Sequence, residues 1–238
     1  MNKVNSNHSV YVLVHGAWHG GWCWKKVKAL LEPKGHMVYT PTLTGLGERS
    51  HLLTPKIDLS THIEDIVSML EYEDLYNVIL VGHSYAGMVI SGVAEKVANR
   101  ISRLVYLDAF LPEDKKSIVD YLVIPSLNTI VSSKGDGWRI PFLGTLEDLG
   151  VRDRKDIDWV KVRVGDQPYK TFTETIDLTQ RGSNIPGTFI QLSRFPWFVD
   201  AGERAKRMGF NYYQMLSGGH NAMISAPNET ALSILQIP

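Results

Sequence analysis

Short apolar runs alternate with amphipathic stretches along this chain, and that rhythm constrains its fold more than any other feature. Runs of strand length, rich in β-branched and aromatic residues, cover residues 10–14, 36–40, 78–81, 101–107, 188–192 and 211–216. Stretches with helical spacing lie between and after them, at residues 24–31, 60–70, 84–97, 196–208 and 229–235. Such alternation predicts an α/β fold with a mainly parallel sheet covered by helices on both faces.

The rhythm breaks between residues 112 and 186, where short helical stretches mix with polar, glycine and proline residues. Open α/β sheets bind ligands at the carboxyl ends of their strands, and insertions belong on the loops there. We therefore expect one domain, with a core formed by residues 1–111 and 187–238 and a helical cap inserted at 112–186. Apolar side chains of this segment can form a lid or simply pack within the cap: Tyr121, Leu122, Ile124, Trp138 and Phe142.

The expected helix after residue 60 has a clear start signal. Ser60 or Thr61 can cap it, and Glu64 stands where a capping box needs a carboxylate. The four histidines outside the motifs discussed below are interpreted as surface residues: His8, His36, His51 and His62.

Charge and cysteine content exclude several classes of protein. Lysine plus arginine and aspartate plus glutamate number 25 each, so no basic excess points to nucleic acid or an anionic membrane. No apolar run is long enough to span a membrane, and the polar start lacks a secretory h-region. Cys23 is the single cysteine, which excludes an intramolecular disulfide and fits a cytoplasmic setting. No phosphate-binding, dinucleotide or metal motif occurs, so we expect no cofactor and no metal. The oligomeric state leaves no signal in the sequence.

The segment G-H-S-Y-A-G at residues 82–87 carries the strongest chemical signal. A buried strand runs directly into a helix of small residues, with Ser84 at the turn. A nucleophile elbow needs small neighbours because the turn is sharp and strained. The usual G-x-S-x-G pattern ends here in Ala86, with Gly87 one step later. Serine is also a favoured helix cap, but the strand before it and the helix after it favour a nucleophile.

Two other segments supply partners for this serine. The segment H-G-A-W-H-G-G-W at residues 15–22 follows the first strand, and such a loop can place the Ala17 N–H beside the nucleophile. The Tyr85 N–H, directly after the serine, would be the second oxyanion donor. Trp18 is expected to line the acyl pocket, although a glycine-rich turn with packing tryptophans is the alternative. In the segment G-G-H-N at residues 218–221, glycines let the loop fold back, so His220 is the predicted general base.

The three motifs, in their order along the chain, resemble those of the α/β-hydrolase superfamily. The chain is most similar to the branch of plant methylesterases, hydroxynitrile lyases and bacterial carboxylesterases of the pyrethroid-hydrolase type. The resemblance implies the α/β-hydrolase fold and covers nearly the whole chain outside the cap. Four residues match its motif positions: Ala17, Ser84, Tyr85 and His220.

The acid of the triad is not where most such relatives keep it. Their acid follows the strand before the last one, but residues 192–196 contain no carboxylate. Asp200 and Glu203 come next, yet both are expected inside a helix. Asp108 closes the strand at 101–107, and a buried carboxylate needs a partner such as His220. We predict Asp108 as the acid, ahead of Asp200 and then Glu203.

These residues predict a serine hydrolase that cleaves carboxylic esters through an acyl-enzyme, and the apolar cap favours small to medium hydrophobic esters. One alternative is a lyase acting on cyanohydrins, but lyases of that branch carry a lysine where Asn221 stands and a threonine in the first motif. Another is a small-molecule binding protein with little turnover. Amide, lactone and carbon–carbon bond cleavage use the same machinery, so the motifs leave them open.

Overall fold

A six-stranded sheet forms the centre of the computed structural model, which describes residues 8–122, 126–179, 182, 184–192 and 196–237. Its strands follow the order β2-β1-β3-β4-β7-β8, and every neighbouring pair is parallel. The strands are β1 Val10–Val14, β2 Met37–Tyr39, β3 Val78–His83, β4 Ile101–Leu107, β7 Gly187–Leu192 and β8 Asn211–Met215. The predicted fold class, an α/β-hydrolase fold with a mainly parallel sheet, is confirmed.

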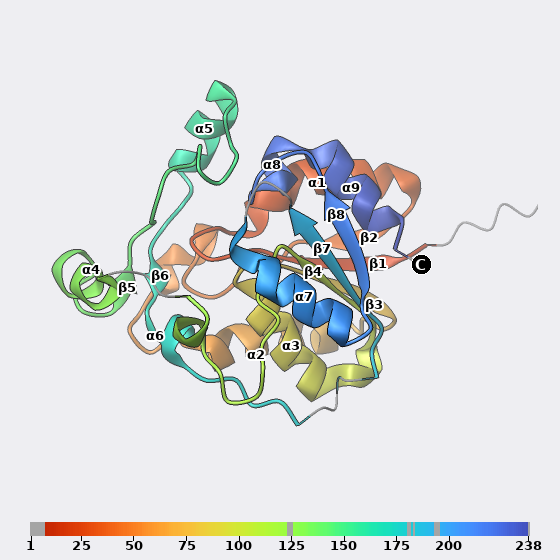
Figure 1. The fold of residues 1–238 in the computed structure, drawn as a ribbon, viewed down its shortest axis with the longest axis horizontal. Coiled ribbons are helices and arrows are strands. Elements are labelled where there is room, and N and C mark those ends of the chain that lie inside the picture. Colours follow the sequence, from red (N-terminus) through yellow and green to blue (C-terminus); the bar gives the residue numbers. More distant parts are fainter. Residues whose placement is uncertain (1–7, 123–125, 180–181, 183, 193–195, 238) are drawn as a thin grey trace, which may run out of the picture.

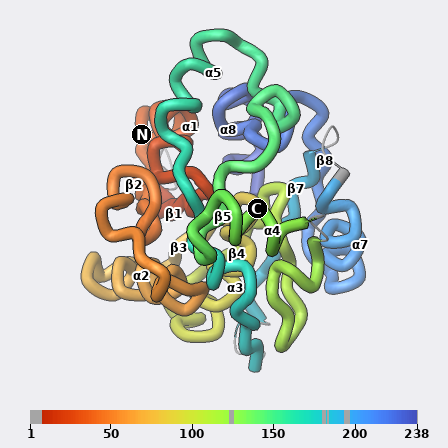
Figure 2. Tube along the Cα trace, turned by 90° about the vertical axis from the view of Figure 1, so that its left-hand side faces the viewer, coloured from red at the N-terminus to blue at the C-terminus, as the bar shows by residue number. Residues whose placement is uncertain are grey.

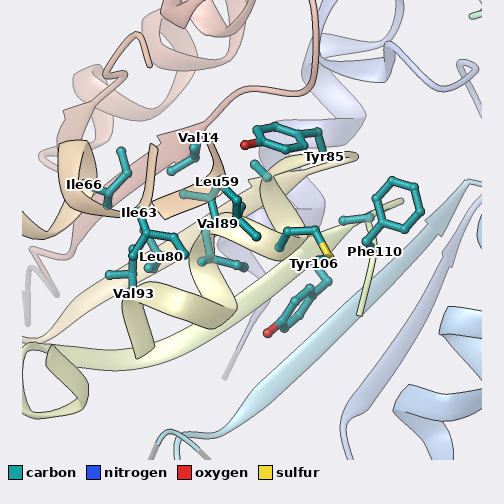
Figure 3. Packing of buried hydrophobic residues seen from close by; sticks show 14 of the residues in the cluster. Val14, Leu59, Ile63, Ile66, Leu80, Tyr85, Val89, Val93, Tyr106 and Phe110 are labelled. Carbon is teal, nitrogen blue, oxygen red and sulfur yellow. The ribbon is translucent and has the colours of Figure 1, made fainter. Parts of the chain in front are cut away.

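Helices cover both faces of this sheet (Figure 1). On one face lie α1 Lys25–Leu31, α8 Ala222–Ser225 and α9 Pro227–Leu235, and on the other α2 Leu59–Tyr72, α3 Ala86–Val97 and α7 Val199–Arg207. Each face of the sheet has its own hydrophobic core, and alternate side chains of β1 point to opposite faces. Val12 and Val14 belong to the core with α2 and α3, whereas Tyr11 and Leu13 belong to the core with α1. Figure 3 shows Ile63, Leu80 and Val89 within the first of these cores. Short 3₁₀ turns add Gly21–Trp24, Glu32–Lys34, Gly47–Leu52, Ala98–Arg100, Ile118–Asp120 and Pro196–Phe198.

The segment 112–186 forms a separate group of elements on one side of the sheet, and Figure 2 looks onto it. Its helices are α4 Leu127–Lys134, α5 Arg154–Lys161 and α6 Lys170–Thr173. Its strands β5 Arg139–Ile140 and β6 Gln167–Pro168 pair antiparallel. The α5 helix is held to the core by an ion pair in which Lys26 Nζ lies 2.6 Å from Asp156 Oδ1. The boundaries of a cap at 112–186 stay a prediction.

The start of α2 differs from the sequence prediction. Asp58 caps this helix, not Ser60 or Thr61: its Oδ1 accepts the Thr61 N–H at 2.9 Å, and the helix begins at Leu59. Thr61 completes the capping box because its Oγ1 accepts the Asp58 N–H. Glu64 takes no part in the cap and pairs with a lysine of α3. Aspartate is as good a cap as serine, and its extended backbone decided where the helix starts.

Candidate active site

Ser84 lies in the turn between β3 and α3. Its φ of 55° is in the left-handed region, where a residue with a side chain is strained. The end of β4 holds this conformation from the side: the Ser84 N–H donates to the Leu107 carbonyl at 3.3 Å, and the Phe110 N–H donates to the Ser84 carbonyl at 3.1 Å. Packing against the neighbouring strand therefore maintains the strain that a nucleophile elbow requires.

Small residues around the serine are a steric necessity. A Cβ on Gly82 would lie 2.7 Å from the Ala86 carbonyl oxygen, so β3 and α3 could not approach as closely. At Gly87 a Cβ would lie 1.9 Å from the carbonyl oxygen of Phe110. The glycine that the turn needs on its helical side is thus Gly87, which explains why Ala86 is tolerated one position earlier.

We expect Gly87→Ala to destabilise the protein by about 3 kcal/mol or more, because backbone cannot move away from the added methyl group without distorting the turn. Chemical denaturation followed by far-UV circular dichroism measures this change. Gly165→Ala is the matched control, since a Cβ added there would have no atom of the described residues within 4 Å. A Gly87→Ala variant as stable as Gly165→Ala would contradict the steric argument.

The loop after β1 passes directly beside the serine. A Cβ on Gly16 would lie 3.0 Å from the Ser84 Cβ, so only glycine allows this approach. Ala17 and Tyr85 are both buried and line the same cavity as Ser84. Within the described ranges, neither backbone N–H donates to a protein acceptor. Two such amides beside a serine can hold an oxyanion.

His220 lies in the loop between β8 and α8 and contacts a buried carboxylate. Its Nδ1 is 2.8 Å from Asp108 Oδ2. The other oxygen of Asp108 accepts hydrogen bonds from Gln191 Nε2 at 3.0 Å and from the Leu192 N–H at 3.2 Å. Donors on both oxygens fix the orientation of the carboxylate, which in turn fixes the imidazole ring.

The position of β4 in the sheet explains how Asp108 reaches this place. Because β4 and β7 are neighbours, a carboxylate at the end of β4 lies beside the end of β7, where relatives are expected to keep their acid. Asp200 and Glu203 are exposed on α7, and Glu203 pairs with Lys206. The geometry therefore favours Asp108 over both alternatives.

Burial determines the charge state of the histidine. It lowers the pKa of His220 to about 3, so the imidazole is neutral at neutral pH. Burial also raises the pKa of Asp108. A neutral His220 that donates its Nδ1–H to Asp108 leaves Nε2 as a base. The ring is held further by His83, whose Nε2–H donates to the His220 carbonyl at 2.8 Å, and by Phe198, which stacks on it at 5.4 Å.

His62 is not a surface residue, which corrects the sequence interpretation. It is fully buried on α2, with Nδ1 2.8 Å from the Tyr85 hydroxyl and Nε2 2.9 Å from the Thr44 carbonyl. Burial lowers its pKa to about 4. The signal was present, because residue 62 falls on the same helical stripe as Ile63 and Ile66. His62 therefore holds the side chain of Tyr85, the residue that follows Ser84.

His19 links the two loops on either side of the serine. Its Nδ1–H donates to the Ala17 carbonyl at 2.7 Å, and its Nε2 accepts from Asn221 Nδ2 at 3.1 Å. Burial lowers the pKa of His19 to about 4, which keeps both roles available in the neutral ring. The loop of Ala17 and the loop of His220 thus hold each other.

A cavity of about 460 Å³ opens above the serine. Five of the predicted site residues line it, namely Ala17, Trp18, Ser84, Tyr85 and His220, and Asp108 lies behind His220. The rest of the wall is largely apolar: Phe110, Leu122, Leu143, Leu149, Phe172, Trp197 and Phe198.

Part of this wall comes from the segment 112–186. Leu122, expected in the lid, lines the cavity, and Phe142 packs edge-on against Trp18 with ring centroids 5.9 Å apart. Ile124 lies outside the described residues. Sequence reasoning missed Phe172 and Leu143. The four-residue helix that holds Phe172 and the irregular segment that holds Leu143 are both too short to show a periodicity that marks the face they present.

The described part of the chain contains neither a cluster suited to a metal ion nor a helix suited to a membrane span. No three histidine, cysteine, aspartate or glutamate side chains in it are grouped so as to hold a metal. None of its helices combines the length and the apolar character that crossing a membrane requires.

Comparison with known proteins decides the family. A sequence model of a protein family, described as the alpha/beta hydrolase family, matches residues 11–231 of this chain. The chain belongs to the α/β-hydrolase family. This α/β-hydrolase is 38% identical to the carbendazim hydrolyzing esterase of Nocardioides sp. (strain SG-4G), over 93% of this chain and 96% of that protein. It is 39% identical to methylesterase 2 of Arabidopsis thaliana over 118 residues, 45% of this chain and 41% of that protein.

Solved structures agree on the fold of this α/β-hydrolase. An extracellular α/β-hydrolase from a Paenibacillus species superposes with a TM-score of 0.83 at 24% identity, covering 95% of this chain and 97% of that one. A pyrethroid hydrolase from Sphingobium faniae JZ-2 gives a TM-score of 0.72 at 21% identity, covering 96% of each. The predicted resemblance is confirmed. The two sequence relatives are named as an esterase and a methylesterase, which confirms the prediction of a carboxylic ester hydrolase as the enzyme class.

Proposed function

We propose that this chain hydrolyses small to medium hydrophobic carboxylic esters through a triad of Ser84, His220 and Asp108. The observation that carries the proposal is the contact between His220 Nδ1 and the buried Asp108 carboxylate beside the cavity that Ser84 lines. The missing acid after β7 would favour a binding protein with little turnover, and the carboxylate of Asp108 beside His220 weighs against that alternative. The single buried cysteine supports a cytoplasmic location as part of the same proposal.

The reaction follows from the roles of these groups. Ser84 Oγ attacks the ester carbonyl carbon while its proton passes to His220 Nε2, and catalytic hydrogen bonds of this kind tighten in the substrate complex. The amides of Ala17 and Tyr85 hold the oxyanion. Collapse of the tetrahedral intermediate expels the alcohol, which takes the proton from His220. Water then attacks the acyl-enzyme, gives its proton to His220, and releases the acid as Ser84 recovers its proton.

The cavity supports the substrate class. Its volume of about 460 Å³ suits a small or medium ligand, and its walls are mostly aromatic and aliphatic. The relative from Nocardioides is named for carbendazim hydrolysis, and hydrolysis of a related carbonyl substrate by this chain belongs to the same proposal.

A covalent probe tests the nucleophile. We expect an alkyl fluorophosphonate to modify the folded protein once, at Ser84, and to abolish hydrolysis of p-nitrophenyl butyrate in proportion to labelling. Intact-mass and peptide mass spectrometry locate the adduct. Ser84→Ala should lose both labelling and turnover, whereas Ser91→Ala, a serine of α3 outside the cavity lining, should keep both. The proposal is contradicted if the folded wild-type protein takes no label and hydrolyses no ester in a panel of varied acyl and alcohol groups. Release of cyanide from mandelonitrile would favour the lyase instead.

A further inference from the structure

Every hydrogen-bonding group of Trp18 is held by the segment 112–186. Its backbone N–H donates to Gln167 Oε1 at 3.1 Å, and its indole N–H donates to the Ile140 carbonyl at 2.9 Å. Its own carbonyl accepts the Gly165 N–H at 3.0 Å. Trp18 has a φ of 63°, so its backbone is held in the left-handed region, where a residue with a side chain is strained. A strained residue beside the serine is therefore held in place from outside the core.

The peptide between Ala17 and Trp18 is fixed at both of its polar ends. His19 donates to its carbonyl oxygen at 2.7 Å, and Gln167 accepts from its N–H at 3.1 Å. Because a peptide is planar, two such bonds determine the orientation of the whole unit. Only the two backbone dihedrals of Ala17 then separate this unit from the Ala17 N–H.

The amide of Gln167 is itself oriented. The Thr171 hydroxyl donates to the Pro168 carbonyl at 2.6 Å, so its oxygen is left to accept from Gln167 Nε2 at 2.8 Å. With Nε2 directed at Thr171, Oε1 must face Trp18. Gln167 and Thr171 are both fully buried, so water cannot replace either bond without opening the site.

The same stretch of chain also supports the second oxyanion residue. Phe172 follows Thr171, and its ring meets Trp18 edge-on with centroids 5.8 Å apart and stacks on Tyr85 at 6.1 Å. Residues 167–172 therefore contact Trp18, which follows Ala17, and also contact Tyr85 itself. They reach Tyr85 directly and Ala17 through Trp18, and these are the two residues whose amides are expected to form the oxyanion hole beside Ser84.

From this geometry we infer that Gln167 is a positioning residue for the oxyanion hole, which acts through the Trp18 N–H. The inference rests on the proposed function. An oxyanion donor must point to where charge develops, and its contribution is lost when it is displaced by about 1 Å. The inserted segment thereby contributes to catalysis as well as to the wall of the cavity.

The test replaces the acceptor by a side chain of similar length. For Gln167→Met we expect kcat on p-nitrophenyl butyrate to fall about 10- to 100-fold with KM changed less than about threefold, because the oxyanion forms only in the transition state. The inhibition constant of an aryl trifluoromethyl ketone, whose adduct with Ser84 carries an oxyanion, should rise by the same factor. Thr171→Val removes the group that orients Gln167, together with the Thr171 hydrogen bonds to the Pro168 carbonyl and the Tyr85 side chain. It should give a loss in the same direction and serves if Gln167→Met does not fold.

Ser117→Ala is the matched control, a buried polar residue of the same segment whose hydroxyl bonds Asp120 and not the site. It should lower the melting temperature while leaving kcat and the ketone inhibition constant unchanged. The inference is overturned if the Gln167 and Thr171 variants keep the wild-type inhibition constant, or lose kcat no more than Ser117→Ala. The variants are compared with a wild-type enzyme that takes the fluorophosphonate label at Ser84 and hydrolyses the ester. If the wild type does neither, the proposed function fails, and that outcome is distinct from a failure of this inference.

Discussion

Asp108→Asn should lower kcat for ester hydrolysis by about 10⁴-fold while the protein stays folded. The asparagine amide can still occupy the site, but it can turn a donor toward His220 Nδ1 and favour the tautomer with its proton on Nε2. That tautomer cannot accept the proton of Ser84. Steady-state kinetics with p-nitrophenyl butyrate, together with circular dichroism to verify folding, measure the effect.

Two variants on α7 are the controls for this prediction. Asp200→Asn and Glu203→Gln remove the other carboxylates considered for the triad, and both residues are exposed. Each should keep kcat within about twofold of wild type, because neither change reaches the cavity. Near-normal turnover of a folded Asp108→Asn enzyme, or a large loss in either control, would show that Asp108 is not the acid.

The free energy of unfolding should fall steeply as the pH drops below about 6.5. Burial lowers the pKa of five histidines. The pKa falls to about 3 for His15 and His220, to about 4 for His19 and His62, and well below its ordinary value for His83. Below pH 6.5 the unfolded chain binds protons that the folded chain does not, so stability is lost as the pH falls toward these folded pKa values. Each histidine contributes about 1.4 kcal/mol per pH unit in this window.

The effect of Asp108 on this slope has the opposite sign, because burial raises the pKa of Asp108, and it offsets part of the histidine contribution. The net slope is then on the order of 5 kcal/mol per pH unit, against a typical total stability of about 5–15 kcal/mol. We therefore expect acid unfolding between about pH 4 and 5.5, measured by urea titration at a series of pH values.

A single buried histidine can be removed to check the origin of this slope. His62→Gln should reduce the slope by about 1.4 kcal/mol per pH unit, whatever its stability at pH 7. His51→Gln is the control, since this side chain is exposed and meets water in both states. An unchanged slope in His62→Gln, or constant stability from pH 7 to 4.5, would contradict the assignment.

Much of the fold could be predicted because its signals are local. The run at residues 78–83, the glycine on either side of the turn and the small residues of α3 lie within one stretch, so strand, elbow and helix could be derived together. Boundaries were less certain. Asp58 took the cap expected at Ser60 or Thr61 because both are good caps and only the backbone conformation separates them.

The sequence by itself determined a parallel α/β sheet with a serine at a strand–helix junction and a histidine in a glycine-rich loop, since periodicity and turn chemistry are properties of adjacent residues. Only the tertiary structure decided which carboxylate meets His220, because that contact joins residues 112 positions apart and depends on β4 lying beside β7. The same holds for Gln167, which is 149 positions from Trp18. Contacts of this kind are set by strand order and by the path of the inserted segment, and no local pattern encodes either.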